Sequence, residues 1–406
     1  MGSKVLLGDV IRLDDSRRQP LSSKQREGRK GSYPYYGAQG VVDYLDDYTY
    51  DGTYLLVAED GENLRSRKLP LANLVTGKFR VNNHAHVLSG TDKCDIRILG
   101  WLLNSMNLTP YVTGSTQPKL SQKNLLAIEL DLPSVEEQQS IMAILGSIDN
   151  KIALNQRAND YLLEMLIAVQ KRQFSNSQLT ECRADQAFEI HIGKTPPRKE
   201  HEWFSFDHAD NAIWMSIKDM GNAGVYLIDS SEYLTQRAVE QFNIKPCKPG
   251  SVLLSFKLTI GRVGIVANEM VTNEAIACFS SSDPRKLAWL FPQLKTYDYA
   301  SLGSTSSIAT AVNSKMIKAM PINIPSEGVL DDFYRDAKPI YDLLLTNANE
   351  IASLEQLRDA LLPKLMSGEI DVSRVDLTQL NNHLFFGAPN IVASFGCGSS
   401  IVAVID

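Results

Sequence analysis

A ladder of apolar residues, spaced alternately by four and three positions, occurs twice in this chain of 406 residues. The first ladder starts at Ile141, and the second starts at Phe333, 192 residues later. A 4-3 spacing places side chains on one stripe of an α-helix, and two such stripes pack together as a coiled coil. We therefore predict a tandem duplication with one long helix in each half. The ladders are Ile141, Leu145, Ile148, Ile152, Asn155, Asn159, Leu162, Leu166 and Val169, then Phe333, Ala337, Ile340, Leu344, Asn347, Ile351, Leu354, Arg358 and Leu361.

The ladders divide the chain into two similar halves, each with a globular stretch followed by a helix. The first predicted domain covers residues 1–133 and its helix 134–175, and the second covers 176–325 with its helix at 326–370. Residues 371–406 are apolar, rich in Gly and Ser, and fit neither half. The predicted fold class is α+β: two tandem domains of mixed helix and strand, separated by two long antiparallel coiled-coil helices, with a pseudo-two-fold internal repeat.

Short motifs outside the helices also repeat, at offsets of 189 to 192 residues. Apolar or β-branched runs bounded by Gly, Asn and Asp predict strands within both domains. The matched motifs are Asn82-Asn-His-Ala85 with Thr272-Asn-Glu-Ala275, Gly114-Ser-Thr116 with Gly303-Ser-Thr305, and Leu132-Pro-Ser134 with Ile324-Pro-Ser326. The predicted strands are Tyr54–Ala58, Val252–Phe256 and Val263–Ala267.

The helix ends carry recognisable signals. Ser134 begins the sequence Ser-Val-Glu-Glu, which predicts a capping box. Pro339 and Pro363 lie inside the second helical pattern and predict kinks or a broken start, because proline lacks the backbone donor that a helix needs. Asn155 and Asn347 occupy equivalent seam positions, so in an antiparallel pair the two amides either meet on the axis and fix the register or reach solvent at a frayed seam.

Charge is distributed unevenly along the chain, whose formal net charge is −6. Residues 1–132 carry 17 Lys and Arg against 15 Asp and Glu, whereas residues 326–406 carry 5 against 12. A basic surface for an acidic partner is therefore compatible with the acidic total. No cationic leader and no apolar run of membrane-spanning length occurs, which predicts a cytoplasmic protein. The five scattered cysteines form no Cys-x-x-Cys pair and are interpreted as reduced core thiols.

The motifs of common enzymes are missing. The chain has no phosphate-binding loop of the Gly-x-x-x-x-Gly-Lys type, no Gly-x-Ser-x-Gly elbow and no Asn/Asp-Pro-Pro-aromatic motif. His84 and His86 near Cys94 come nearest to a metal site, but two histidines on alternate strand positions supply too few ligands, so a structural role is favoured. We predict a protein that is not an enzyme and binds no metal or cofactor of its own.

Basic residues that alternate with aromatic and amide side chains favour nucleic acid as the partner. Cations neutralise phosphates, while tyrosine, amide and guanidinium groups read base edges. The alternative is that the tyrosines pack a core and the charges form a solvated face. The predicted DNA-binding residues are Lys24, Arg26, Arg29, Lys30, Tyr33, Tyr35, Tyr36 and Gln39 in the first half, and Lys194, Arg198, Lys199, Lys218, Lys257 and Arg262 in the second.

These motifs resemble those of one family, the specificity subunits of type I restriction-modification systems. The resemblance covers most of residues 4–372 and coincides with the duplication. The motifs that carry it are Tyr33-Pro-Tyr-Tyr-Gly-Ala-Gln-Gly40, Gly114-Ser-Thr-Gln-Pro-Lys-Leu-Ser121, Leu132-Pro-Ser-Val-Glu-Glu-Gln138, Gly193-Lys-Thr-Pro-Pro-Arg198, Trp214-Met-Ser-Ile-Lys-Asp219, Leu254-Ser-Phe-Lys-Leu-Thr-Ile-Gly-Arg262, Thr272-Asn-Glu-Ala275 and Leu361-Leu-Pro-Lys-Leu-Met-Ser-Gly-Glu-Ile370.

The resemblance implies two target-recognition domains that each read one half of a split sequence in double-stranded DNA. It also implies that the helices dock two methyltransferase subunits, that motor-nuclease subunits join this core, and that S-adenosylmethionine, ATP and magnesium belong to those partners. The helices would separate the half-sites by about one DNA turn, ~34 Å. Glu136-Glu-Gln138 in the first helix is matched by Gly328-Val-Leu330 in the second, a departure from equivalent docking. The competing hypotheses are a methyltransferase or nuclease in its own right, a coiled-coil scaffold that joins two non-DNA domains, and a DNA-binding protein without restriction-modification partners.

Overall fold

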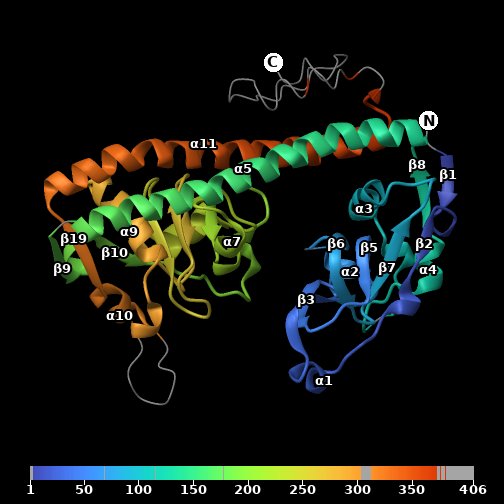
Figure 1. Ribbon diagram of the computed structural model, residues 1–406, viewed down its shortest axis with the longest axis horizontal. Helices are drawn as coiled ribbons and strands as arrows, with labels where there is room; N and C mark the ends of the chain where they lie inside the picture. The colour runs from blue at the N-terminus through green and yellow to red at the C-terminus, as the bar shows by residue number, and fades with distance from the viewer. Residues whose placement is uncertain are drawn as a thin grey trace. The chain divides into compact units, whose positions relative to one another are not determined.

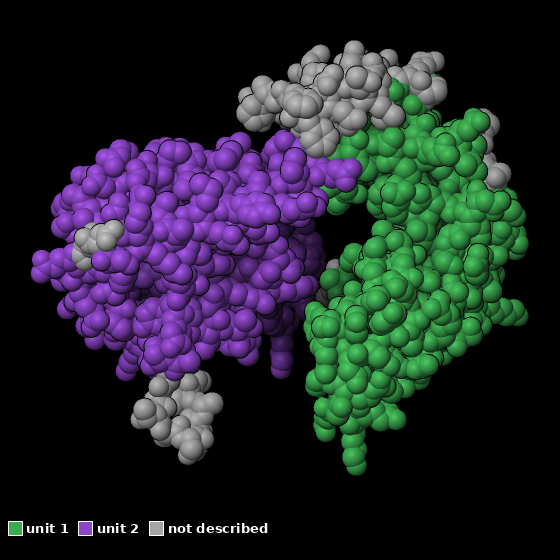
Figure 2. Space-filling model, in the orientation of Figure 1, with its two compact units in different colours: residues 1–149, 356–406 green, residues 150–355 purple. Residues whose placement is uncertain are grey.

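The computed structural model describes residues 3–67, 69–114, 116–176, 178–302 and 312–372, together with residues 375 and 380. It has a mixed α/β fold that divides into two compact units (Figure 2). Unit 1 contains residues 1–149 and 356–406, and unit 2 contains residues 150–355. Among the described residues, no helix is both long enough and apolar enough to cross a membrane.

Unit 1 is built on a six-stranded sheet with the strand order β2-β7-β5-β6-β3-β4 (Figure 1). All neighbouring strands in it are antiparallel except β3 and β6, which are parallel. A separate two-stranded sheet joins β1 to β8. The strands are β1 Ser3–Leu6, β2 Ile11–Leu13, β3 Lys30–Gly37, β4 Gly40–Leu45, β5 Tyr50–Ala58, β6 Ala72–Val81, β7 Ala85–Gly90 and β8 Glu129–Leu132, and the short helices are α1 Ser23–Glu27, α2 Asn63–Ser66, α3 Ile96–Ser105 and α4 Gln122–Leu126.

Unit 2 contains a five-stranded sheet with the order β10-β18-β15-β16-β13 and a four-stranded sheet with the order β11-β14-β12-β17. A two-stranded sheet joins β19 to β9. The strands are β9 Leu179–Arg183, β10 Glu189–Ile192, β11 Phe204–Ser205, β12 Asn211–Met215, β13 Tyr226–Leu227, β14 Tyr233–Thr235, β15 Val252–Ser255, β16 Val263–Val266, β17 Val271–Thr272, β18 Ile276–Ser280 and β19 Pro321–Pro325, and the short helices are α6 Ala184–Ala187, α7 Ile217–Asn222, α8 Gln236–Gln241, α9 Pro284–Lys295 and α10 Ser314–Ala319. The three strands predicted from sequence coincide with the end of β5, with β15 and with β16.

The two units share one frame. The order β2-β7-β5-β6-β3 in unit 1 matches β10-β18-β15-β16-β13 in unit 2, and the last pair in each series is parallel. The helix after the second strand is capped alike in both, because Asp95 accepts a hydrogen bond from the backbone N–H of Arg97, and Asp283 does so from Arg285. The arginine side chain then returns to the capping carboxylate at 2.8 Å and 2.7 Å.

Two long helices, α5 (Val135–Asn176) and α11 (Glu327–Met366), each contribute residues to both units. Most of the predicted seam residues are buried, and Ile148, Phe333 and Leu354 are fully enclosed. Five others are only half-buried: Asn159, Leu162, Val169, Ile351 and Arg358. In unit 1 the Asp149 carboxylate pairs with the Arg358 guanidinium at 3.1 Å. The cross-helix contacts in unit 2 join lower numbers on one helix to higher numbers on the other, as in an antiparallel pair.

The proposed meeting of Asn155 and Asn347 is wrong. Both amides are buried, but the Asn155 Nδ2 donates to the Glu350 carboxylate at 2.7 Å, and the Asn347 Nδ2 donates to Asn159 Oδ1 at 2.8 Å. The register of the two helices thus differs from the predicted one: Asn155 lies opposite Glu350, next to Ile351, and Asn347 lies opposite Asn159, the residue equivalent to Ile351. Because Asn159 is replaced by Ile351 in the second half, the Asn155 amide turns to the adjacent Glu350 instead.

The helix ends follow the sequence signals in part. The predicted capping box is confirmed: the backbone N–H of Ser134 donates to the Glu137 carboxylate at 2.8 Å, and Ser134 Oγ accepts from the backbone N–H of Glu137 at 3.3 Å. A broken start to the second helix is not observed, because α11 continues through Pro339 and Pro363. The chain leaves the helix soon after Met366 through Gly368, whose φ of +73° favours glycine.

Some sequence predictions fall outside the described residues. These are the motif at 303–305, Ser115 in its first copy, Cys397 and nearly all of the extension after 372.

Candidate nucleic-acid interface

The basic cluster of unit 1 is largely neutralised by acidic residues of the β3–β4 region. Arg26 and Lys30 both pair with Asp43, at 2.6 Å in each case. Hydrogen bonds from Lys30 and from the backbone of Tyr44 lower the pKa of Asp43, so this carboxylate is ionised at neutral pH. Arg29 pairs with two further carboxylates, which raise its pKa. Only part of the predicted positive charge is therefore available to a ligand.

Arg29 pairs with the carboxylates of Asp46 and Asp47, at 3.0 Å and 2.7 Å from its guanidinium group. Asp47 also pairs with the buried Arg80. By contrast, Lys24 on α1 is exposed and has no ion pair with any residue that the structure describes. Three carboxylates thus balance most of the charge on Arg26, Arg29, Lys30 and Arg80.

The three tyrosines of β3 divide between the surface and the core. Tyr35 is 1% exposed, and its hydroxyl accepts a hydrogen bond from the backbone N–H of Leu21 at 2.8 Å. It cannot reach DNA, and the prediction that it does so is corrected. Tyr33 packs against Tyr48 with ring centroids 5.1 Å apart, and Tyr36 packs edge-on against Phe79, so both are half-buried.

Gln39 lies at the tip of the β3–β4 hairpin and is exposed. The adjacent Gly40 has a φ of +123°, a conformation that L side chains rarely adopt. The tight turn therefore presents the Gln39 amide at the end of the hairpin. Its Nε2 atom lies 4.0 Å from the point that a Cβ atom on Gly61, in the β5–β6 connection, would occupy.

In unit 2, Arg198 is held in an aromatic setting. Its guanidinium lies 4.5 Å from the Phe204 ring centroid and 4.4 Å from that of Trp214. Nη1 donates to both carboxylate oxygens of Glu232 at 2.8 Å. Half of the side chain remains exposed. Stacking and the ion pair fix the orientation of a planar donor group whose remaining N–H groups face solvent.

The other predicted cations of this loop differ in availability. Lys194 Nζ donates to the backbone carbonyls of Phe242 and Asn243, at 2.8 Å and 2.9 Å, and so closes the end of α8. Lys199 is exposed and has no ion pair within the described part of the chain. The loop therefore offers one unpaired charge next to one oriented guanidinium.

The structure brings the last three predicted residues together. Arg262 donates a hydrogen bond from Nη1 to the backbone carbonyl of Ile217, which ties the β15–β16 connection to α7. Gly221 lies against the Arg262 guanidinium, where any side chain would collide with it. Arg262 therefore positions two exposed lysines, Lys218 on α7 and Lys257 in the β15–β16 connection.

Sequence reasoning missed two features of this surface. One is the aromatic pair under Arg198, whose members come from separate strands. The other is Leu258, which is 98% exposed and has a φ of +60° at the tip of the β15–β16 connection. An exposed leucine in a left-handed turn is unusual, and this one could have been suspected from its place between Lys257 and Thr259, in the short connection between two predicted strands.

The histidines considered for a metal do not converge on Cys94. His84 Nδ1 faces Asp60 at 2.8 Å, whereas His86 is buried with Nδ1 2.6 Å from Asp15 and Nε2 2.9 Å from the Leu120 carbonyl. Burial opposes ionisation of Asp15, but hydrogen bonds from His86 and from the backbone of Val87 outweigh it and lower its pKa. This group is a satisfied ionic network inside unit 1.

Comparisons with known proteins agree on one family. A family model described as the type I restriction modification DNA specificity domain matches residues 3–164. A protein of Haemophilus influenzae named as a type I restriction enzyme specificity subunit is 30% identical over 65% of this chain and 67% of its own length. The specificity subunit of the HindI type I restriction enzyme, from the same species, is 26% identical over 82% of this chain and 87% of its own.

Among solved structures, the chain is similar to the type I restriction-modification S subunit of M. genitalium. The TM-score is 0.49 at 15% identity, and the match covers 90% of this chain and 96% of that one.

Proposed function

The chain belongs to the specificity subunits of type I restriction enzymes, and we propose that each of its two units reads one half of a bipartite target in double-stranded DNA. Residues 1–133 and 176–325 are the proposed target-recognition domains. The helices at 134–175 and 326–370 are the proposed spacer. The repeat of one strand order in both units is the observation that carries the proposal, because two copies of one frame with different loops suit two different half-sites.

Unit 2 would bind DNA through its exposed cations and its oriented arginine. Lys199, Lys218 and Lys257 are suited to phosphates, since none of them is committed to an ion pair among the described residues. Arg198 is suited to a base edge in the major groove, because stacking on Phe204 and Trp214 fixes its plane. Lys194 and Arg262 would act by positioning the loops that carry these residues.

Unit 1 would rely less on net charge and more on hydrogen bonding. Gln39 at the hairpin tip is suited to an adenine edge, and Lys24 to a phosphate. Tyr33 and Tyr36 retain partly exposed faces for sugar or base contacts. Arg26, Arg29 and Lys30 would have to exchange a carboxylate for a phosphate, so they would contribute less affinity than unpaired cations do.

The helices would set the distance between half-sites. At 1.5 Å per residue, α5 with 42 residues and α11 with 40 would each be roughly 60 Å long. We propose that they hold the two readers about one DNA turn apart, ~34 Å, and that the bases between the half-sites go unread.

The outward faces of the same helices are the proposed docking sites for two methyltransferase subunits, which motor-nuclease subunits would join. Exposed apolar residues such as Leu154, Tyr161, Met165 and Leu343 support this role. Gln138 is not part of that face: it is 3% exposed, accepts from the backbone N–H of Asp95, and is replaced by the equally buried Leu330 in the second helix. The third position of the mismatch between Glu136-Glu-Gln138 and Gly328-Val-Leu330 therefore does not prevent the two helices from docking their partners in the same way.

In this proposal the chain confers specificity and leaves methylation and cleavage to its partners. The test is to co-express it with its cognate methyltransferase subunit and to map DNA methylation by single-molecule sequencing. We expect a split motif with a constant unread gap, methylated on both strands. The double variant Lys199→Ala/Lys218→Ala should reduce methylation, and Lys123→Ala serves as the control, because this exposed lysine on α4 lies outside the proposed DNA contacts and the two long helices.

A stable complex that produces no new methylated motif would overturn the proposal. The favoured alternative would then be a coiled-coil scaffold that joins two non-DNA domains, and such a scaffold would show no salt-dependent binding of DNA.

A further inference from the structure

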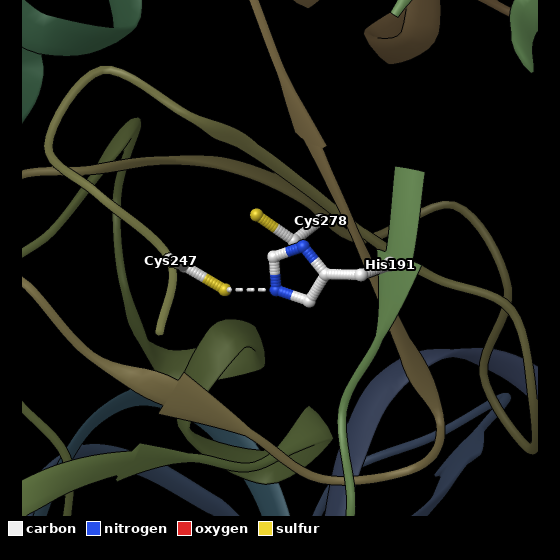
Figure 3. A group of neighbouring side chains, drawn as sticks. All are labelled: His191, Cys247 and Cys278. Atoms are coloured by element: carbon white, nitrogen blue, oxygen red, sulfur yellow. Dashed lines mark hydrogen bonds between the residues drawn. The ribbon is translucent and has the colours of Figure 1, made fainter. Parts of the chain in front are cut away.

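Three side chains of the kinds that bind soft metal ions converge inside unit 2. His191 on β10 and Cys278 on β18 are cross-strand neighbours. Cys247 comes from the segment between α8 and β15, which is joined to Met270 by an isolated β-bridge. Figure 3 shows both sulfur atoms on one side of the His191 ring. Their donor atoms all lie within 4.8 Å of one another.

The spacing suits a tetrahedral ion. The Cys247 Sγ lies 3.5 Å from the His191 Nε2. With Zn–S bonds of about 2.3 Å and Zn–N bonds of about 2.0–2.1 Å, tetrahedral angles put a sulfur and a nitrogen ligand about 3.5–3.6 Å apart. This pair therefore already stands at ligand spacing, and the second sulfur is within reach of the same centre.

The chemistry of the site also suits a cation. Cys247 and Cys278 are fully buried, whereas His191 is half-buried and gives access from one side. A divalent ion bound by two thiolates would leave no net charge in the core.

An orphaned polar group adjoins the site. Thr272 is completely buried, and its hydroxyl lies beside the Cys247 thiol yet has no hydrogen-bond partner of good geometry. A buried hydroxyl without a partner is costly, and a water or hydroxide in the fourth position of a tetrahedral metal ion would satisfy it.

We propose that His191, Cys247 and Cys278 bind one zinc ion, with a water held by the Thr272 hydroxyl as the fourth ligand. The ion joins three segments of unit 2 and is structural. It lies next to the loop of Lys194, whose backbone N–H donates to the Thr272 carbonyl at 2.9 Å. The ion therefore stiffens the base of a loop that carries proposed DNA contacts, but the site is independent of the proposed function and its test needs no DNA.

The experiment measures metal in the full chain, purified without an affinity tag or chelator under reducing conditions. Elemental analysis should find about one zinc per chain. Replacing zinc by cobalt(II) should produce a thiolate-to-cobalt charge-transfer band and the visible bands of tetrahedral cobalt. Cys247→Ser and Cys278→Ser should each lose most of the bound metal and of the cobalt spectrum.

Cys94→Ser and Cys182→Ser are the matched controls, since these thiols lie elsewhere, and both should retain the metal. In unit 1 the equivalent strand pair places Leu13 opposite Leu88. The double variant His191→Leu/Cys278→Leu introduces the same apolar pair in unit 2, so it should fold without metal. Reduced wild-type chain with neither zinc nor a cobalt spectrum would overturn the proposal, whatever the variants do. So would a Cys247–Cys278 disulfide, seen as a mass lower by two hydrogens, or metal retained in both cysteine variants.

Discussion

In unit 1 the strand pair β2–β7 aligns Leu13 with Leu88, whereas in unit 2 the equivalent pair β10–β18 aligns His191 with Cys278. Two residues further along the same strand pairs, unit 1 has the polar pair and unit 2 has the apolar one. Unit 1 places Asp15 against His86, and unit 2 places Gly193 against Ile276. Each copy of the frame thus carries a polar pair at one of these two register positions and an apolar pair at the other.

This exchange teaches that the duplication preserved strand order rather than core chemistry. The polar pair of unit 1 is satisfied internally, because Asp15 also accepts from the backbone N–H of Val87 at 2.7 Å and pairs with Arg18 at 3.1 Å. The polar pair of unit 2 is joined by a third polar side chain, because the Cys247 Sγ lies 3.5 Å from the His191 Nε2, and the buried Thr272 hydroxyl beside this group has no hydrogen-bond partner of good geometry. An ionic network and a metal site are two ways to make a buried polar pair stable.

The predicted DNA-binding surfaces of the two units also differ in how far their cations are paired with carboxylates. In unit 1 most of the predicted cations pair with carboxylates that are close in sequence, whereas in unit 2 Lys199, Lys218 and Lys257 have no ion pair with a described residue. Two readers built on one frame would therefore differ in how strongly salt affects them.

The largest expected effect comes from breaking the ionic network of unit 1. Asp15→Ala leaves the buried His86 without its carboxylate and should lower the free energy of unfolding of unit 1 by about 3–5 kcal/mol. Hydrogen exchange at the β7 amides measures this loss. Asp9→Ala, which removes an exposed carboxylate nearby, should change it by less than about 0.5 kcal/mol. Equal effects for both variants would mean that the network does not support the sheet.

The same network predicts a pH dependence. Because the folded state lowers the pKa of Asp15 from 3.8, its ionised form stabilises the fold above that value, and the contribution is lost as the pH falls through the lower folded pKa. The difference in urea midpoint between wild type and Asp15→Asn should be constant at about pH 5–7 and shrink below pH 3.8. A difference that grew on acidification would contradict this assignment.

A smaller effect is expected in the helix seam, where equivalent asparagines make unequal bonds. Asn155→Ala removes a hydrogen bond to a carboxylate and should cost about 1.5–3 kcal/mol, whereas Asn347→Ala removes a neutral one and should cost about 0.5–1.5 kcal/mol. Urea unfolding followed by circular dichroism measures both, with the exposed Gln156→Ala as the control. Equal costs would indicate that Lys151, which pairs with Glu350 at 3.2 Å, compensates for the lost amide.

The smallest effects concern DNA affinity. Lys218→Ala should reduce the slope of log affinity against log salt by about 0.9 if it loses one phosphate contact. Lys30→Ala should reduce it by less, because Asp43 already neutralises this lysine. Fluorescence anisotropy over a salt series, with target-containing duplex, distinguishes the two. A larger change for Lys30 would reverse the comparison between the units.

Features that depend only on the spacing of neighbouring residues could be predicted from the sequence. The helix seams, the capping box at Ser134 and the strands at Tyr54, Val252 and Val263 all follow from the spacing of neighbouring residues. The partners of the cations do not, since Glu232 lies 34 residues from Arg198 and could be matched to it only in three dimensions. His191 and Cys247 are 56 residues apart, and no local motif joins them.

Alternation in a strand shows that two faces exist but not which face is covered. For that reason Tyr35 could not be assigned to the core from its sequence. The asparagine pairing failed for a related reason: the ladder fixes which residues of each helix face the other helix, but not which residue of that helix lies opposite each of them.

We propose that the two target-recognition domains are held at a distance fixed by α5 and α11. The most direct test removes one heptad from α5 and the matching heptad from α11, then maps methylation by the complex. Each deletion shortens a helix by about 10 Å, or about three base pairs of DNA. We expect the half-sites to stay unchanged and the unread gap to become about three base pairs shorter. Methylation of the original motif with its original gap would contradict it.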